Sequence, residues 1–222
     1  TLGTYVRHPQ PGSIALDVRD AAAIGRCFDD FKPRLVFLAI HPPGGVDHCE
    51  RHPQECAAVI ALGTKRVIES AARHGAKVVF FSSDYVFDGK SGPYSEEDVP
   101  RPVNAYGRAK GQAEQIVREA SAGHLIVRTT AVFGWQRPST NFAMQVWEKL
   151  AAGKSFRVPL DQWGNPTLVE YLAQASLRLA LGGAQGVINV VGKDRMPRSE
   201  LGQRLAKAMG LDPGLIIPVA TS

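Results

Sequence analysis

A tyrosine and a lysine lie one helical turn apart near the middle of the chain, shortly after two serines. Tyr106 and Lys110 stand at positions i and i+4, while Ser82 and Ser83 close an apolar run. Residues four apart share one helix face, so the ammonium is expected to lower the pKa of the phenol, which is about 10 in free tyrosine. Such a phenol can donate a proton to a carbonyl oxygen as a hydride adds to the carbon, and a serine hydroxyl can hold that oxygen. We assign this serine role to Ser83, which ends the strand, with Ser82 as the alternative.

The spacing of Tyr106 and Lys110 alone also fits an ordinary pair on a solvated helix face. The surrounding order is more specific: an apolar run, then "SSDY", a polar loop, the Y-x-x-x-K sequence opening a helix, and another apolar run. This order favours chemistry over a surface pair, because it brings the serines and the helix to the same end of the strand.

The elements that position these residues alternate between strands and helices. Strands are expected over 13–18, 34–40, 76–83 and 124–129, and helices over 20–31, capped by Asp20, over 47–74, interrupted near Pro53 and ended by Gly75, and over 104–121. This alternation predicts βαβ units and a parallel sheet covered on both faces.

The character of the sequence changes from about residue 131. Helices are expected over 140–152, 168–182 and 198–209, and one strand over 186–191. We therefore predict two parts: a main domain over 1–130 and a smaller lobe over 131–222, with some strands and helices returning to the main domain. In open α/β sheets, ligands bind beyond the carboxyl ends of the strands. The loop after Ile40, the stretch from Ser82 to Asp84 and the loop after Arg128 should therefore converge on one crevice.

The composition narrows the class of protein. The 222 residues carry a formal net charge of +5, but basic and acidic residues are mixed along the chain. No stripe of the kind that binds nucleic acid is present, so we expect no nucleic-acid partner. No apolar run reaches the roughly 20 residues of a membrane span, and no signal-peptide pattern opens the sequence. The odd cysteine count, with Cys27, Cys49 and Cys56, favours reduced thiols and a cytoplasmic location.

Several quoted motifs resemble one enzyme family. The stretches "SSDYVFDG", "PYSEEDVPRPVNAYGRAKGQAE", "VRTTAVFG" and "DQWGNPT" are similar to extended short-chain dehydrogenase/reductases. Within these, the chain resembles the dTDP-4-dehydrorhamnose reductase branch, which also contains the regulatory beta subunit of methionine adenosyltransferase. The resemblance runs from about residue 3 to 220. It implies an α/β fold: a Rossmann-type doubly wound parallel sheet with a small C-terminal substrate-binding lobe.

The resemblance also implies a reaction, the NAD(P)H-dependent reduction of a nucleoside-diphosphate 4-keto-6-deoxy sugar. Ser83 matches the residue that polarises the keto group, Tyr106 the proton donor, and Lys110 the lysine that holds the nicotinamide ribose. The positions matching the substrate pocket are Asp84, Tyr85, Asn141, Gln162 and Thr167. For the last three, loop and helix-cap roles are the alternative.

The cofactor side departs from the family pattern. No G-x-G-x-x-G turn occurs, and the opening "TLGTYVRH" resembles the second strand of the fold, as expected of a piece of a longer protein or of a chain that has lost the pyrophosphate cradle. Arg7 favours NADP over NAD, because arginine accommodates a 2′-phosphate; a surface arginine is the alternative. Asp17 and Val18 end a strand where the adenine is expected, although Asp17 could equally cap the following loop. Ala39 stands in 38–41, where the family has Asn-Ala-Ala.

A further departure is Ile60, which stands where the family has a helix asparagine. The loss suits the second function that the resemblance implies, a non-catalytic NADP-binding regulatory subunit. An epimerase or dehydratase is a third option, but those enzymes use further acid/base residues and only Asp84 is at hand. The resemblance is also compatible with a homodimer in which the helices over 47–74 and 104–121 pair across a two-fold axis.

One run of side chains imitates a metal site. His48, His52 and Cys56 follow one another at intervals of four, which is a spacing for zinc ligands on a helix. Pro53 falls inside the run and interrupts the helix, so the three need not share one face. We therefore expect no metal.

Overall fold

The computed structural model describes residues 1–42, 44–120, 123–136 and 141–221. The chain divides into two compact units, one formed by Thr1–Arg128 with Leu179–Asn189, the other by Thr129–Arg178 with Val190–Ser222. The lobes predicted from the sequence, 1–130 and 131–222, stay a prediction.

A parallel sheet forms the centre of the first unit. Its strands follow the order β10-β5-β4-β3, with β10 at Gly186–Asn189, β5 at Leu125–Thr129, β4 at Lys77–Ser83 and β3 at Leu35–Leu38. The β3–β4 and β5–β10 pairs are both parallel. The strands β1 (Gly3–Tyr5) and β2 (Ser13–Ala15) form a separate parallel pair. The predicted α/β fold with a parallel sheet is thus confirmed.

The helices of this unit begin within two residues of the predicted starts. Helix α1 (Ala21–Phe31) is capped by Asp20, whose carboxylate accepts from the N–H of Ala23 at 2.9 Å. The stretch predicted as an interrupted helix contains α2 (Gly45–Arg51), α3 (Pro53–Ala57), the π-helix η1 (Ala58–Leu62) and α4 (Gly63–His74). Gly75 ends it in the left-handed conformation, with φ of 63°.

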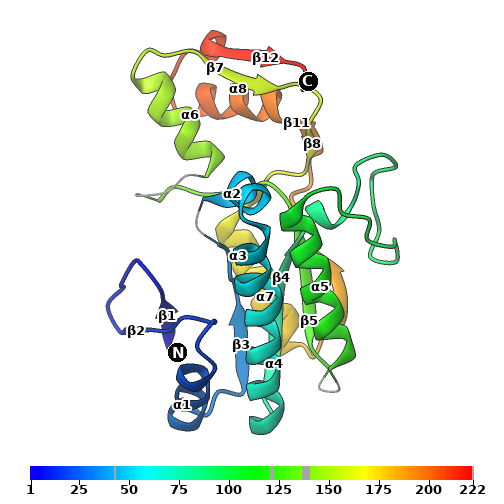
Figure 1. Cartoon of the computed structure of the whole chain (residues 1–222). Coiled ribbons are helices and arrows are strands. Elements are labelled where there is room, and N and C mark those ends of the chain that lie inside the picture. The colour runs from blue at the N-terminus through cyan, green and yellow to red at the C-terminus, as the bar shows by residue number, and fades with distance from the viewer. Residues whose placement is uncertain (43, 121–122, 137–140, 222) are drawn as a thin grey trace. The chain divides into compact units, whose positions relative to one another are not determined.

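Helix α5 (Ala105–Glu119) carries the tyrosine and the lysine. It begins at the cap residue Asn104, whose side chain accepts from the N–H of Gly107 at 2.8 Å. Residue 121, the end of the predicted helix, lies outside the described residues. In Figure 1, α3 and α4 follow one another as one run, and α5 lies beside this run on the same face of the sheet. Ala109 and Ala113 of α5 pack into a core with Phe80 of β4 and Ile60 of η1.

The second unit has three α-helices among its described residues: α6 (Phe142–Ala151), α7 (Val169–Leu181), whose last turn belongs to the first unit, and α8 (Arg198–Ala208). A short 3-10 helix, η3 (Pro213–Leu215), precedes the last strand. Its strands form short pairs: β6 (Val132–Phe133) with β9 (Thr167–Leu168), β7 (Phe156–Pro159) with β12 (Ile216–Val219), and β8 (Trp163–Gly164) with β11 (Met196–Pro197). The three pairs were not predicted, because segments of two to four residues show no periodicity. Residue 140 of the predicted helix lies outside the described residues.

A core of buried aliphatic side chains holds α6, α8, β7 and β12 together; it contains Val146, Leu150, Val158, Ala206 and Ile216. Among the residues that the structure describes, no helix combines the length and apolar character that crossing a membrane requires.

Candidate active site

The backbone at the end of β4 brings α5 close to the serines. After Ser83 the chain forms the short 3-10 helix η2 (Asp84–Val86). A Cβ atom added at Gly107 would lie 2.0 Å from the carbonyl oxygen of Tyr85, so only glycine permits this approach. The first turn of α5, with Tyr106, therefore packs directly on the segment that follows β4.

Lys110 is a buried cation held by main-chain carbonyl groups. Its Nζ donates to the oxygen of Phe81 at 2.7 Å and to that of Ile40 at 3.3 Å, and only 3% of the residue is exposed. It also lies 4.7 Å from the ring centroid of Phe80. Loss of solvent lowers the pKa of Lys110 to about 8, although Cys56 and Glu114 act in the opposite direction. The side chain can thus change its charge near neutral pH.

Tyr106 lies between two other rings. Its ring centroid is 5.4 Å from that of His41 and 5.7 Å from that of Tyr85, which meets it edge-on. Burial raises the pKa of Tyr106, and the Asp84 carboxylate raises it further, while a hydrogen bond with Ser83 acts in the opposite direction. The phenol is therefore protonated at neutral pH.

The prediction that Lys110 lowers the pKa of Tyr106 is wrong. The lysine ammonium lies 5.8 Å from the centroid of the tyrosine ring and bonds to main-chain carbonyls instead. Desolvation of the phenol outweighs an attraction at that range. The sequence showed the shared helix face but not the depth at which the pair is buried.

The two serines have different partners. Ser82 Oγ donates to the Glu114 carboxylate at 2.6 Å. Ser83 Oγ donates to the Asp84 carboxylate at 3.0 Å, accepts from the N–H of Tyr85 at 3.3 Å and also bonds with the Tyr106 phenol. Ser83 is thus the serine beside the tyrosine.

The residues predicted to bind the cofactor differ in exposure and in their contacts. Arg7 is exposed just after β1. Asp17 accepts from the main-chain N–H of Arg19 at 2.8 Å and from its guanidinium, and these bonds lower the pKa of Asp17. The aspartate thus does cap the following loop. Val18 packs so closely on α4 that a Cβ atom at Gly63 would come within 2.7 Å of it. Ala39 is exposed directly after β3.

Three residues predicted to face the nucleotide lie in the second unit. Asn141 caps α6, accepting from the N–H of Met144 at 3.3 Å and donating to the carbonyl of Gly134 at 2.9 Å. Thr167 is buried and donates to the carbonyl of Asn165 at 2.9 Å. Gln162 is exposed. Asn141 and Thr167 thus have the cap and loop roles that were the alternative.

Comparisons with known proteins place the chain in a family. The model of the RmlD substrate binding domain matches residues 5–222. The chain belongs to this family. The methionine adenosyltransferase 2 subunit beta of Xenopus tropicalis is 28% identical over 98% of this chain and 67% of its own length. A dTDP-4-dehydrorhamnose reductase of Sinorhizobium fredii is 34% identical over 76% of this chain and 53% of its own length.

A solved structure agrees with this assignment. The dTDP-4-dehydrorhamnose reductase of Bacillus anthracis, solved in complex with NADP, matches with a TM-score of 0.87 and 26% identity, over 93% of this chain and 73% of that one. The resemblance inferred from the motifs and the Rossmann-type fold of this RmlD-family chain are confirmed.

The sequence reasoning missed two residues next to the site, Glu114 and Arg128. Both are buried, and they form an ion pair of 2.8 Å. The signal was available, because Arg128 interrupts an apolar run predicted to be a buried strand, and a buried charge requires a partner. Glu114 follows Lys110 by four residues and so lies on the same face of α5.

The run that imitates a metal site is held by ordinary contacts. His48 bonds to the Glu55 carboxylate at 3.1 Å, and its ring lies 4.5 Å from that of His52, measured between centroids. Cys56 is buried in the core of the first unit. Within the part of the chain that the structure describes, no group of three or more His, Cys, Asp or Glu side chains is arranged to hold a metal ion.

Proposed function

We propose that this chain carries the catalytic residues of an NADPH-dependent reductase acting on a nucleoside-diphosphate 4-keto-6-deoxy sugar, like the dTDP-4-dehydrorhamnose reductases that it resembles. One observation carries the proposal. Ser83, Tyr106 and Lys110 meet at the carboxyl end of β4, with the Ser83 hydroxyl on the Tyr106 phenol and Lys110 buried beside them. This is the place where open α/β sheets bind ligands.

Each of the three residues has a distinct task. Tyr106 holds a proton at neutral pH and donates it to the keto oxygen of the sugar. Ser83 hydrogen-bonds to the same oxygen and so stabilises the charge that develops on it. The nicotinamide cofactor supplies the hydride. Lys110, at the ends of β3 and β4, stands where the nicotinamide ribose would be held.

The cofactor-side residues fit NADP better than NAD. The structure gives Arg7 no ionic partner among the described residues, so its guanidinium is available for a 2′-phosphate. Asp17 is engaged by Arg19 and is less suited to bind a ribose hydroxyl. Val18, after β2, and Ala39, after β3, would offer apolar contacts. Cofactor discrimination, measured as the ratio of kcat/KM with NADPH and NADH, tests this part.

The residues predicted to bind the substrate fall in both predicted lobes. Asp84 and Tyr85 lie next to Ser83 and Tyr106, where they can contact the sugar. In the lobe over 131–222, the exposed Gln162 would face the nucleotide, whereas Asn141 and Thr167 have cap and loop roles. All three cysteines are free thiols, which supports a cytoplasmic location. We also propose that two copies of the chain form a homodimer through α4 and α5.

The test is a reductase assay. NADPH oxidation is followed with a panel of nucleoside-diphosphate 4-keto-6-deoxy sugars, in wild type, in Tyr106→Phe and in the control Tyr171→Phe, which removes an exposed hydroxyl. Loss of the proton donor should lower kcat by about 10²- to 10⁴-fold, and the control should match wild type. Full activity in Tyr106→Phe would exclude the proposed role.

A second candidate function is supported by the relatives. Methionine adenosyltransferase 2 subunits beta match almost the whole chain, and Ile60, fully buried in η1, stands where the reductases are expected to have asparagine. In this alternative the chain binds NADP and contacts a catalytic adenosyltransferase subunit without turning over a sugar. Copurification with that subunit, together with no turnover of any keto sugar, would favour it.

A further inference from the structure

Helix α5 buries more polar side chains than the proposed reaction uses. Tyr106, Lys110 and Glu114 follow at intervals of four and form one stripe of the helix. Glu114 is as deeply buried as the other two, but the proposed reaction gives it no task. A buried carboxylate that does no chemistry needs another explanation, because its desolvation costs several kcal/mol.

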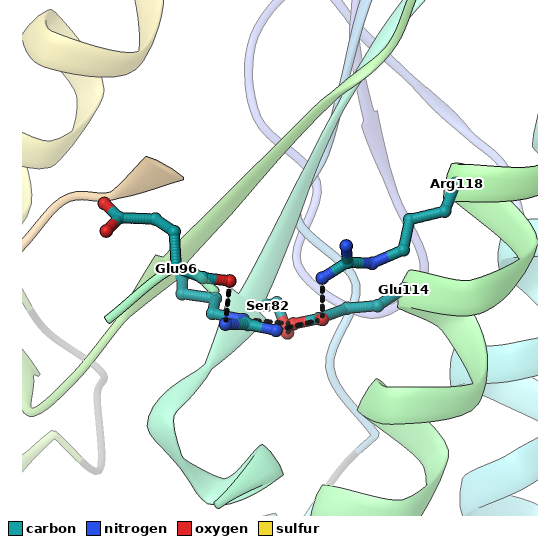
Figure 2. Close-up of polar contacts among 5 residues, drawn as sticks. Ser82, Glu96, Glu114 and Arg118 are labelled. Atoms are coloured by element: carbon teal, nitrogen blue, oxygen red, sulfur yellow. Dashed lines mark hydrogen bonds and ion pairs between the residues drawn. The ribbon is translucent and has the colours of Figure 1, made fainter. Parts of the chain in front are cut away.

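Glu114 is surrounded by donors. Arg128 bonds to it in bidentate fashion, with Nε 2.9 Å from one carboxylate oxygen and Nη2 2.8 Å from the other. Ser82 donates to the first oxygen at 2.6 Å, and Arg118 approaches the second to 3.5 Å. Figure 2 shows Ser82 and Arg118 converging on Glu114 from β4 and from the next turn of α5. Short bonds of this kind between charged groups are strong and directional.

The network extends to the loop between β4 and α5. Arg128 donates to the carbonyl oxygen of Glu96 at 3.3 Å, and its guanidinium lies 4.9 Å from the ring centroid of Phe87. The side chain of Glu96 accepts from the N–H of Asn189 in β10 at 2.8 Å. One set of contacts therefore connects β4, β5, β10, α5 and the loop.

Resting on the reductase function proposed above, we propose that Glu114, with Ser82 and Arg128, is a positioning residue that fixes α5 against β4. Ser82 directly precedes Ser83 in the sequence, and Glu114 lies one helical turn after Lys110 on α5. A change in the rotation or axial position of α5 at Glu114 is therefore transmitted to Tyr106. Apolar packing alone would allow the helix to slide, whereas a bidentate bond fixes its register.

The experiment compares variants of the network with a variant of the core. Glu114→Gln removes the charge of the carboxylate, and Ser82→Ala removes one of its hydrogen-bond donors. The control, Ile24→Val, removes a methylene from the buried face of α1, away from the network. Displacement of the catalytic groups should lower kcat by about tenfold to hundredfold in Glu114→Gln, and less in Ser82→Ala, with KM little changed. Ser82→Thr keeps the hydroxyl and should restore kcat. Ile24→Val should keep wild-type kcat.

A role in stability alone would give a different result: Ser82→Ala and Glu114→Gln would then lose thermal stability as Ile24→Val does, with kcat within twofold of wild type, and the proposal would be overturned. If Glu114→Gln does not fold, the kcat values of Ser82→Ala and Ser82→Thr decide between positioning and stability alone.

A readout without turnover separates the two proposals. The pKa of Lys110, followed by NMR of its side chain, should change in Ser82→Ala, which keeps the Glu114 carboxylate, and stay constant in Ile24→Val. Glu114→Gln is left out of this readout, because the Glu114 carboxylate raises the pKa of Lys110 directly. If wild type reduces no sugar but Lys110 responds in this way, the reductase function fails while the positioning of α5 stands. An unchanged pKa of Lys110 in Ser82→Ala overturns the positioning.

Discussion

Lys110 and Glu114 lie one turn apart on the same buried stripe of α5, yet the protein treats the two charges differently. Glu114 is neutralised by the Arg128 guanidinium and receives a further bond from Ser82. The hydrogen bonds of Lys110 go to two neutral main-chain carbonyls, and burial lowers its pKa to about 8. The ion pair of Glu114 therefore stabilises the structure, whereas Lys110 can change its protonation state, which is a property of residues that take part in chemistry.

The largest change in stability should come from removing the Arg128 guanidinium that pairs with Glu114. Arg128→Met fills a similar volume but strands a buried carboxylate, so the free energy of unfolding should fall by about 3–5 kcal/mol. Urea denaturation measures it. The control is Arg204→Met, which breaks an equally short pair with Glu200, 2.6 Å long but with side chains 60% and 41% exposed. That variant should lose only about 0.3–0.5 kcal/mol. Similar losses in both would remove the distinction drawn between buried and exposed pairs.

A smaller effect should come from Lys110, and it should depend on pH. The folded pKa of about 8 lies below the ordinary value of 10.5, so between these values the unfolded chain holds a proton that the folded chain has lost. Stability therefore rises with pH in this window, by about 3 kcal/mol, and Lys110→Met should abolish this rise.

The measurement is the difference between wild type and Lys110→Met in urea at pH 8 and above. The subtraction is needed because Tyr106 and Cys49 have raised pKa values, and such acids lower stability as the pH rises. Parallel pH curves for wild type and Lys110→Met would show that Lys110 is better solvated than its burial indicates.

The smallest effect should separate the two adjacent serines. Ser82→Ala removes a hydrogen bond to a buried carboxylate and should cost about 1.5–3 kcal/mol of stability. Ser83→Ala should cost less, about 0.5–1.5 kcal/mol, since Ser83 bonds to the uncharged Tyr106 phenol and to the half-buried Asp84 rather than to a fully buried carboxylate. Thermal unfolding of both variants tests the contrast. A reversed order would mean that Ser83 belongs to the framework.

Local sequence determined most of the fold. Asp20 and Gly75 fixed the ends of helices through side-chain and main-chain bonds within a few residues, and Pro53 marked the break between α2 and α3. The apolar runs before Ser83 and around Arg128 predicted β4 and β5, because a strand buried on both faces contains few polar residues. The short strand pairs of the second unit were missed, since each is formed by a partner distant in the sequence.

The sequence by itself also determined the family and the presence of Ser83, Tyr106 and Lys110 on neighbouring elements. Only the tertiary structure decided their electrostatics. Burial reversed the expected direction of the Tyr106 pKa shift, because desolvation depends on everything packed around the phenol. The pairing of Glu114 with Arg128 joins a helix to the strand after it, and no local pattern specifies such a contact. Spacing along a chain sets which side chains share a face, whereas the packed fold sets how far each is from water.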